Sequence, residues 1–89
     1  MCRIAFAPSI QRHVPVAERE LPAVTLAGAL EAVFAETPAL RGYLLDDQGG
    51  LRRHLTIFID GLRVRDRGGF SDVLAPDSEV YVVQALSGG

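Results

Sequence analysis

The chain of 89 residues contains no lysine, no tryptophan and a single cysteine, Cys2. One cysteine cannot form a disulfide within the chain, which is typical of a reducing compartment. Long apolar runs are also missing. None approaches the roughly 20 residues of a membrane-spanning helix, and the apolar stretch at the N-terminus is too short for a signal peptide. We therefore expect a cytoplasmic protein with no membrane partner, in which Cys2 lies at a frayed, inert start.

Charge is nearly balanced, with nine arginines against eleven acidic residues and a net charge of −2. A nucleic-acid-binding domain carries a clear excess of positive charge, so we expect no nucleic-acid partner. The lack of lysine has a chemical consequence. A reactive carboxyl group at the end of this chain would meet no side-chain amine within the chain, only the N-terminal amine.

Sequence signatures of catalysis are absent as well. The two histidines, His13 and His54, have no cysteine or carboxylate at ligand spacing, and the glycine pairs at 49–50 and 68–69 lack the lysine of a phosphate-binding loop. A domain of this size buries about 60–65% of its unfolded surface, which leaves little room for an internal cavity. We predict no catalytic residue, no metal and no bound cofactor, and a function at the surface or at an end.

The first third of the chain predicts a hairpin. Residues 3–8 alternate between larger and smaller apolar side chains, which indicates a strand. Prolines punctuate residues 9–15, which predicts a turn. Residues 16–21 are more polar and predict an edge strand, in which Glu18, Arg19 and Glu20 face solvent.

The segment TLAGALEAVFAETP predicts the main helix, at about residues 25–36. Thr25 is a favourable N-cap, and Pro38 ends the helix because the residue before a proline avoids helical geometry. An apolar stripe recurs at helical spacing and should face the core. Its members are Leu26, Ala29, Leu30, Val33 and Phe34.

The remainder predicts strands joined by turns. Residues 39–51 read as a long irregular connection, anchored by Leu40, Tyr43 and Leu44. Asp60-Gly61 is a strong hairpin signal. The predicted elements are strands at 54–59, 62–65 and 79–84, turns at 66–69 and 75–79, and a short helical turn at 70–74.

This order, two strands, one helix and three strands, predicts the α+β class and the β-grasp (ubiquitin-like) fold. The last strand would then pair with the first in the middle of a mixed sheet. A ferredoxin-like sandwich is the alternative, and it requires a second full helix within residues 38–51, where DDQGG interrupts the pattern. We expect a β-grasp domain at 1–84 and a flexible C-terminal tail at 85–89.

Alternation also divides the central strands between two faces. Phe58, Tyr81 and Val83 should lie on the open face of the sheet, followed by Leu86 as the tail departs. An apolar patch of this kind marks partner sites, so we predict these four residues as a partner interface. The helix-facing residues would be Leu55, Ile57, Ile59, Val80 and Val82.

Arginines alternate along the fourth predicted strand, at Arg63, Arg65 and Arg67. Two interpretations stay open. The arginines are a solvated strand edge of little energetic value, or they steer the protein towards an acidic partner.

The chain ends on QALSGG, directly behind the last predicted strand. Paired glycines have the most backbone freedom to lose on ordering, and termini fray unless other contacts hold them. A chain end without a function would not require Gly88-Gly89. We interpret the pair as part of the function.

The second half, from LRRHLTIFIDG to the end, resembles the ubiquitin-like sulfur carriers of the MoaD/ThiS type, and most closely the CysO-like carriers. The first half matches more loosely, through APSIQR and the start of the helix at Thr25-Leu26. The residues that carry the resemblance are Asp60-Gly61, Gly68-Gly69, the turn Pro76-Asp77-Ser78-Glu79 and Gly88-Gly89.

The resemblance implies a specific chemistry at Gly89. An adenylyltransferase of the ubiquitin-activating type (MoeB/ThiF-like) would use ATP to adenylate the terminal carboxylate. Sulfur would then displace AMP and leave a thiocarboxylate for a sulfur-acceptor enzyme, with Gly88 and Ser87 as the tail that enters the partner. The chain itself would be a carrier and not an enzyme, and ATP would belong to the partner.

Several alternatives stay open on the sequence. The acceptor pathway can be cysteine, thiamine or specialised-metabolite biosynthesis, or the chain can be the small subunit of a molybdopterin synthase. A ubiquitin-like modifier without sulfur chemistry is the competing class. The sequence does not decide the oligomeric state, nor whether an extension beyond Gly89 is removed.

Overall fold

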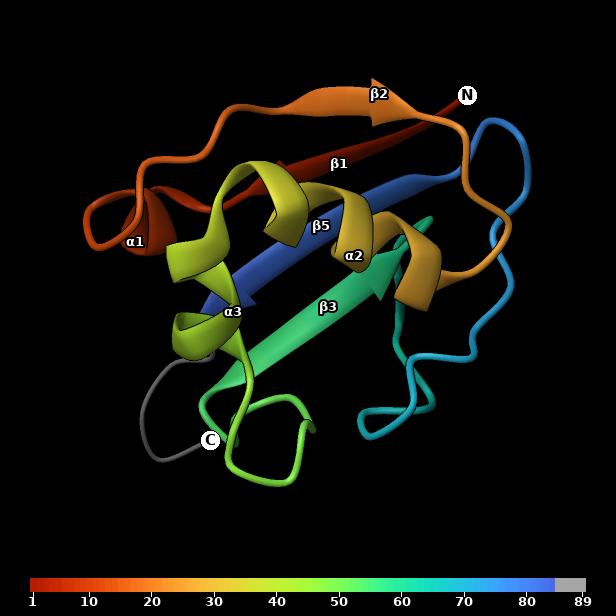
Figure 1. Cartoon of the computed structure of the whole chain (residues 1–89). Coiled ribbons are helices and arrows are strands. Elements are labelled where there is room, and N and C mark those ends of the chain that lie inside the picture. The colour runs from red at the N-terminus through yellow and green to blue at the C-terminus, as the bar shows by residue number, and fades with distance from the viewer. Residues whose placement is uncertain (85–89) are drawn as a thin grey trace.

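The structure, a computed structural model, describes residues 1–84. They form a mixed five-stranded sheet with one long helix across one face (Figure 1). Among these residues no helix has the length and apolar character needed to cross a bilayer. The elements in chain order are β1 (Cys2–Phe6), α1 (Pro8–Gln11), β2 (Arg19–Leu21), α2 (Leu26–Glu36), α3 (Pro38–Leu44), β3 (Leu55–Ile59), β4 (Leu62–Arg63) and β5 (Glu79–Gln84).

The strand order is β2-β1-β5-β3-β4, with β1 and β5 parallel and all other neighbours antiparallel. β5, the last strand in the chain, therefore lies in the middle of the sheet beside the first. Arg3 pairs with Glu79 and Phe6 with Val82. This is the arrangement that the sequence predicted, and the β-grasp fold is confirmed.

The core lies between α2 and the sheet. All five residues of the predicted apolar stripe of α2 are buried, and Ile57 and Val82 beneath them are completely inaccessible. Each such side chain contributes about 1.5–3 kcal/mol through removal from water. The helix begins as expected, since the Thr25 hydroxyl accepts a hydrogen bond from the Gly28 amide at 3.2 Å.

Backbone groups of the loop before β5 complete the start of α2. The first amides of a helix have no partner within it. Here Leu26 N donates to the Asp72 carbonyl at 2.9 Å, and Ala27 N donates to the Phe70 carbonyl at 2.8 Å. The predicted helical turn at 70–74 is therefore wrong. Its backbone pairs with the start of α2, and Val73 forms an antiparallel bridge with Thr25.

The predicted irregular connection at 39–51 is also wrong over its first part, where α3 forms. Pro38 ends α2 as expected, but it also occupies the first turn of α3, a position that favours proline because its missing N–H would have no partner there. The expected anchors Leu40 and Leu44 are both fully buried. Their spacing of four residues was the helical signal, and a single turn of pattern was too short to interpret.

Three smaller predictions need correction. Residues 9–15 begin within the four-residue helix α1 and are not only a turn. Arg19 does not face solvent freely: its strand position pairs with Ile4, and its guanidinium forms an ion pair with Glu36 of α2. Cys2 is not frayed, because it lies in β1, 1% exposed, and its thiol donates to the Leu21 carbonyl at 3.2 Å.

The predicted hairpin at Asp60-Gly61 joins β3 to β4. Both residues have positive φ, 52° and 84°, as expected for the tight turn that matches strand twist. The Asp60 carboxylate also holds the chain before β5, accepting from the Ser78 hydroxyl and the Glu79 amide at 2.9 Å each. One turn thus fixes where the central strand begins.

Asp66 organises the loop that follows β4. Its carboxylate accepts hydrogen bonds from the amides of Gly68, Gly69 and Ser71, and from the Ser71 hydroxyl, at 2.7–3.2 Å. These donors, Gly69 first and Ser71 second, lower the pKa of Asp66 well below its usual value. A Cβ at position 69 would lie 2.9 Å from the carboxylate, so a side chain there would displace the carboxylate from its present position.

We expect Asp66→Asn to lower the free energy of unfolding at neutral pH. A carboxyl group whose folded-state pKa is depressed stabilises the fold above its usual pKa of 3.8 and loses this contribution as the pH falls further. The difference between wild type and variant should therefore shrink below pH 3.8. Urea unfolding at several pH values measures it, and a difference independent of pH would contradict the assignment.

Candidate functional site

The predicted tail at 85–89, which includes Leu86, Ser87, Gly88 and Gly89, lies outside the described residues. The description ends with Gln84, the last residue of β5. Because β5 runs parallel to β1, Gln84 and Met1 lie at opposite ends of the sheet. The features around Gln84 and on the face of the sheet that leads to it are therefore the ones that bear on the predicted function.

The open face, defined as the side of the sheet away from α2, carries the three predicted interface residues of the domain. Phe58 of β3 lies opposite Tyr81 of β5, and Val83 lies opposite Thr56. Tyr81 is 43% exposed, whereas Phe58 and Val83 are partly buried. The structure brings these residues together on one face, and their role as a partner interface stays a prediction.

The helix-facing side of the same strands follows the predicted alternation. The side chains that the sequence assigned to the core are buried, except Ile59, which is partly buried near the end of β3. The buried members are Leu55, Ile57, Val80 and Val82.

A small cluster of side chains surrounds the end of β5. Tyr43 of α3 donates a long hydrogen bond of 3.4 Å to the Gln84 side-chain oxygen. His13, just after α1, stacks on the Tyr43 ring with centroids 5.2 Å apart. We call His13, Tyr43 and Gln84 the tail root. No local sequence pattern indicates this cluster, because 41 residues separate Tyr43 from Gln84.

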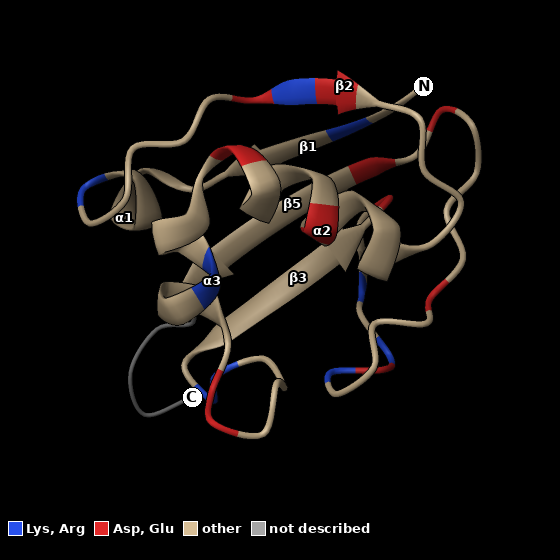
Figure 2. Ribbon diagram, viewed as in Figure 1, with Lys and Arg blue, Asp and Glu red and all other residues tan. Residues whose placement is uncertain are grey.

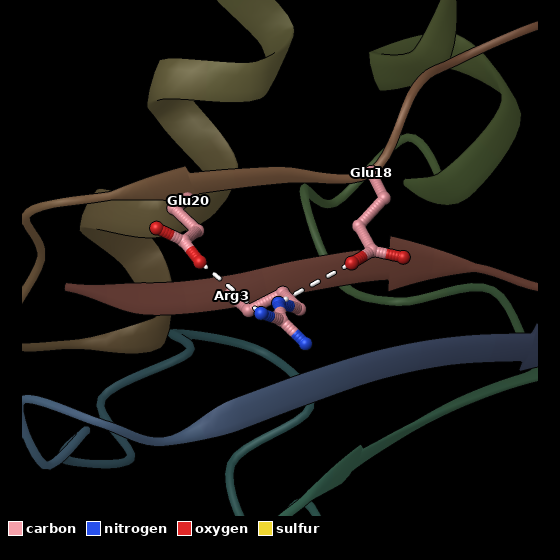
Figure 3. Close-up of polar contacts among 3 residues, drawn as sticks. All are labelled: Arg3, Glu18 and Glu20. Carbon is pink, nitrogen blue, oxygen red and sulfur yellow. Dashed lines mark hydrogen bonds and ion pairs between the residues drawn. The ribbon is translucent and has the colours of Figure 1, made fainter.

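Carboxylates gather at the β2 edge of the open face. The Arg3 guanidinium lies between two of them, with Nε 3.2 Å from Glu18 and Nη2 3.1 Å from Glu20 (Figure 3). The hydrogen bond to Glu20 and the charge of Glu18 raise the pKa of Arg3. Figure 2 shows further acidic residues at the start of β5, where Glu79 pairs with Arg3.

Arginines occupy the opposite, β4 edge. Arg63 pairs with Phe58 across the sheet, and both Arg63 and Arg65 are exposed. Neither takes part in an ion pair among residues 1–84. The third member of the predicted arginine row is different. Arg67 turns inward, where its Nη2 donates to the carbonyls of Arg52 and Leu55 at 2.8 and 2.7 Å, so it is structural.

In residues 1–84 no three side chains of the metal-ligating types lie close enough to hold an ion. An open, mostly apolar groove of about 580 Å³ lies at the Met1 end of the sheet. The Cys2 thiol, which lines this groove, is buried and hydrogen-bonded.

Comparisons with known proteins agree with the fold. No family model and no curated protein matches the sequence. Among solved structures, the chain is similar to CysO of Mycobacterium tuberculosis, with a TM-score of 0.80, 19% identity and coverage of 97% of this chain and 100% of that one. It is similar to the Amycolatopsis orientalis BexX/CysO complex, with a TM-score of 0.79, 18% identity and full coverage of both chains.

The chain is also similar to the small archaeal modifier protein SAMP1 of Methanosarcina acetivorans, with a TM-score of 0.77 and 19% identity over 99% of this chain and 95% of that one. At these identities the likeness shows the fold, and the chain has the β-grasp fold of these ubiquitin-like proteins. CysO structures are thus among the solved structures that share this fold.

The two faces of the central strands should respond differently to truncation. Ile57→Ala is expected to cost about 2–5 kcal/mol of unfolding free energy, because it opens a cavity in the core. Tyr81→Ala should cost less than about 1.5 kcal/mol, since it removes a partly exposed side chain that lies across the sheet from Phe58. Urea unfolding of the two variants compares them. Equal losses would mean that Tyr81 contributes as much to the stability of the fold as a core residue does.

Proposed function

We propose that the chain is a sulfur carrier whose terminal carboxylate, at Gly89, becomes a thiocarboxylate. An activating enzyme of the MoeB/ThiF-like type joins a carboxylate oxygen to the α-phosphorus of ATP, and pyrophosphate leaves. A sulfur nucleophile then forms a bond to the carbonyl carbon, and the bond to AMP breaks. A sulfur-acceptor enzyme takes the sulfur in cofactor, cysteine or specialised-metabolite biosynthesis.

One observation carries the proposal: the central strand of a β-grasp domain ends at Gln84, five residues before a Gly-Gly terminus. Five extended residues reach at most about 16 Å, enough to bring the carboxylate into a partner while the domain stays outside. Gly88 and Gly89 have no Cβ, so the walls of a narrow channel can approach their backbone closely.

The open face supports a carrier that a partner recognises. It offers Tyr81 and Val83 on β5, the strand that leads to the tail, and Phe58 on the neighbouring β3. Aromatic residues are enriched in the centres of protein interfaces. The domain would supply recognition, and the partner would supply the catalytic groups.

The comparisons support two possible functions of the same tail, that of a carrier and that of a modifier. CysO is found in a complex with BexX, which favours a carrier that works with a partner protein. SAMP1 is a modifier protein, which favours attachment of the activated carboxylate to an amine as the second candidate. The resemblance of the sequence to sulfur carriers favours the first.

We expect chemistry only at Gly89. With a cognate activating enzyme, ATP and a sulfur source, the intact protein should gain the mass difference between sulfur and oxygen. Deletion of Gly89 places the carboxylate about 3.3 Å short, and a misplacement of 1 Å can cost about a hundredfold in rate. Loading should nearly vanish, as followed by intact-protein mass spectrometry.

Gly88→Val is the matched variant of unchanged length, and it should also fail because a β-branched side chain closes the channel. Both variants should unfold at the wild-type urea concentration, since neither changes residues 1–84. Normal loading of the deletion variant would refute the proposal. An amide-linked product in place of a thiocarboxylate would favour the modifier.

Docking should depend on the open face. Phe58→Asp or Val83→Asp places a charge into a contact that excludes water, and an unpaired buried charge typically costs several kcal/mol. We expect KM for the activating enzyme to rise at least about tenfold, consistent with the loss of an interface hot spot. Steady-state loading rates measure this effect. Wild-type kinetics in both variants would place the docking face elsewhere.

A further inference from the structure

The open face is polarised across its strands. One cross-strand row runs from Ala5 through Tyr81 and Phe58 to Arg63, each in register with the next. The middle of this row is aromatic. Its flanks differ in sign, because carboxylates lie beyond Ala5 at the β2 edge and an arginine ends the row at the β4 edge.

The open face is net negative at its β2 edge. Glu18 and Glu20 are exposed there, and the Arg3 guanidinium lies between them at 3.2 and 3.1 Å. The other arginine of this edge, Arg19, pairs with Glu36 of α2. Two carboxylates therefore share one guanidinium on the open face. Figure 3 shows Arg3 between Glu18 and Glu20.

The β4 edge presents two arginines without ion-pair partners. Arg63 and Arg65 are exposed there and form no ion pair within residues 1–84. Two carboxylates, those of Asp60 and Asp72, line the same hollow. Both already accept hydrogen bonds from other groups of the chain, so the guanidinium groups are the ones left to meet a partner.

Charges of opposite sign on the two edges can fix the orientation of a docked partner. An apolar patch attracts a partner without fixing its orientation, because hydrophobic contact is non-directional. A tail that leaves along β5 must nevertheless line up with one channel, so rotation about the normal to the open face has to be fixed. Charges of opposite sign on opposite edges fix register and reject wrong orientations.

We propose that the open face docks on an activating enzyme that presents basic side chains to the β2 edge and acidic side chains to the β4 edge. The inference rests on the proposed function and adds to it the charge pattern of the partner. Arg63 and Glu18 then act as orienting residues. They do not touch the reacting carboxylate, and they set the orientation in which Tyr81 and Phe58 contact the enzyme.

A charge swap tests this inference without changing the net charge. The double variant Glu18→Arg/Arg63→Glu inverts the polarity and keeps the total at −2. We expect kcat/KM for adenylation to fall at least about tenfold at low ionic strength, mainly through KM, since like charges would now face each other. The deficit should shrink towards 1 M salt, where the screening length is about 3 Å.

The control is Arg12→Glu/Asp47→Arg, which also exchanges two exposed charges of opposite sign. Arg12 follows α1 and Asp47 follows α3, so neither lies on a strand of the sheet. Its kinetics should stay within about twofold of wild type, because surface charges of this kind contribute little. Circular dichroism and urea unfolding verify that both double variants fold.

Should the charge swap not fold, Glu18→Gln and Arg63→Gln replace it, and each should lower kcat/KM by at least about threefold with the same dependence on salt. Wild-type kinetics in these variants, or equal losses in swap and control, would overturn the inference while the carrier function stands. If the wild-type chain itself is not loaded by any activating enzyme of its genome, both proposals fail together.

Discussion

The parallel pairing of β1 with β5 at the centre of the sheet is the contact on which the rest of the molecule depends. It requires the last strand to insert between the first hairpin and the second, so the core cannot close until the whole domain is present. It also carries Tyr81 and Val83 to the middle of the open face and Gln84 to its end. Hydrogen bonds of Asp60 to Ser78 and Glu79 set where this strand begins.

Elements with strong local patterns were predictable from the sequence. α2 carries an apolar stripe over three turns and an N-cap at Thr25, and β5 alternates over six residues, so each was found at nearly its observed bounds. The division of β3 and β5 into a core face and an open face followed from the same alternation. Here local preference and tertiary structure agree, and agreement across levels is what makes a fold predictable.

The errors have a common physical cause, which is pairing with residues distant in the sequence. Carbonyl groups of residues 70–74 accept hydrogen bonds from the first amides of α2 instead of forming a helical turn. Arg67 turns inward, where its side chain donates to the carbonyls at positions 52 and 55. Cys2 was expected to lie in a frayed terminus, and it is a buried residue of β1. The tail root and the ion pairs of Arg3 with Glu18 and Glu20 likewise depend on contacts between distant residues, which no local sequence pattern predicts.

The placement of Met1 has a practical consequence for work with this protein. Because β1 is parallel to β5, Met1 lies beside the beginning of β5, a full strand length away from Gln84. An affinity handle, a fluorophore or a surface linkage attached there would leave the Gln84 end unobstructed. With no lysine in the chain, amine-reactive labels would spare every side chain of the open face and of the Gln84 end.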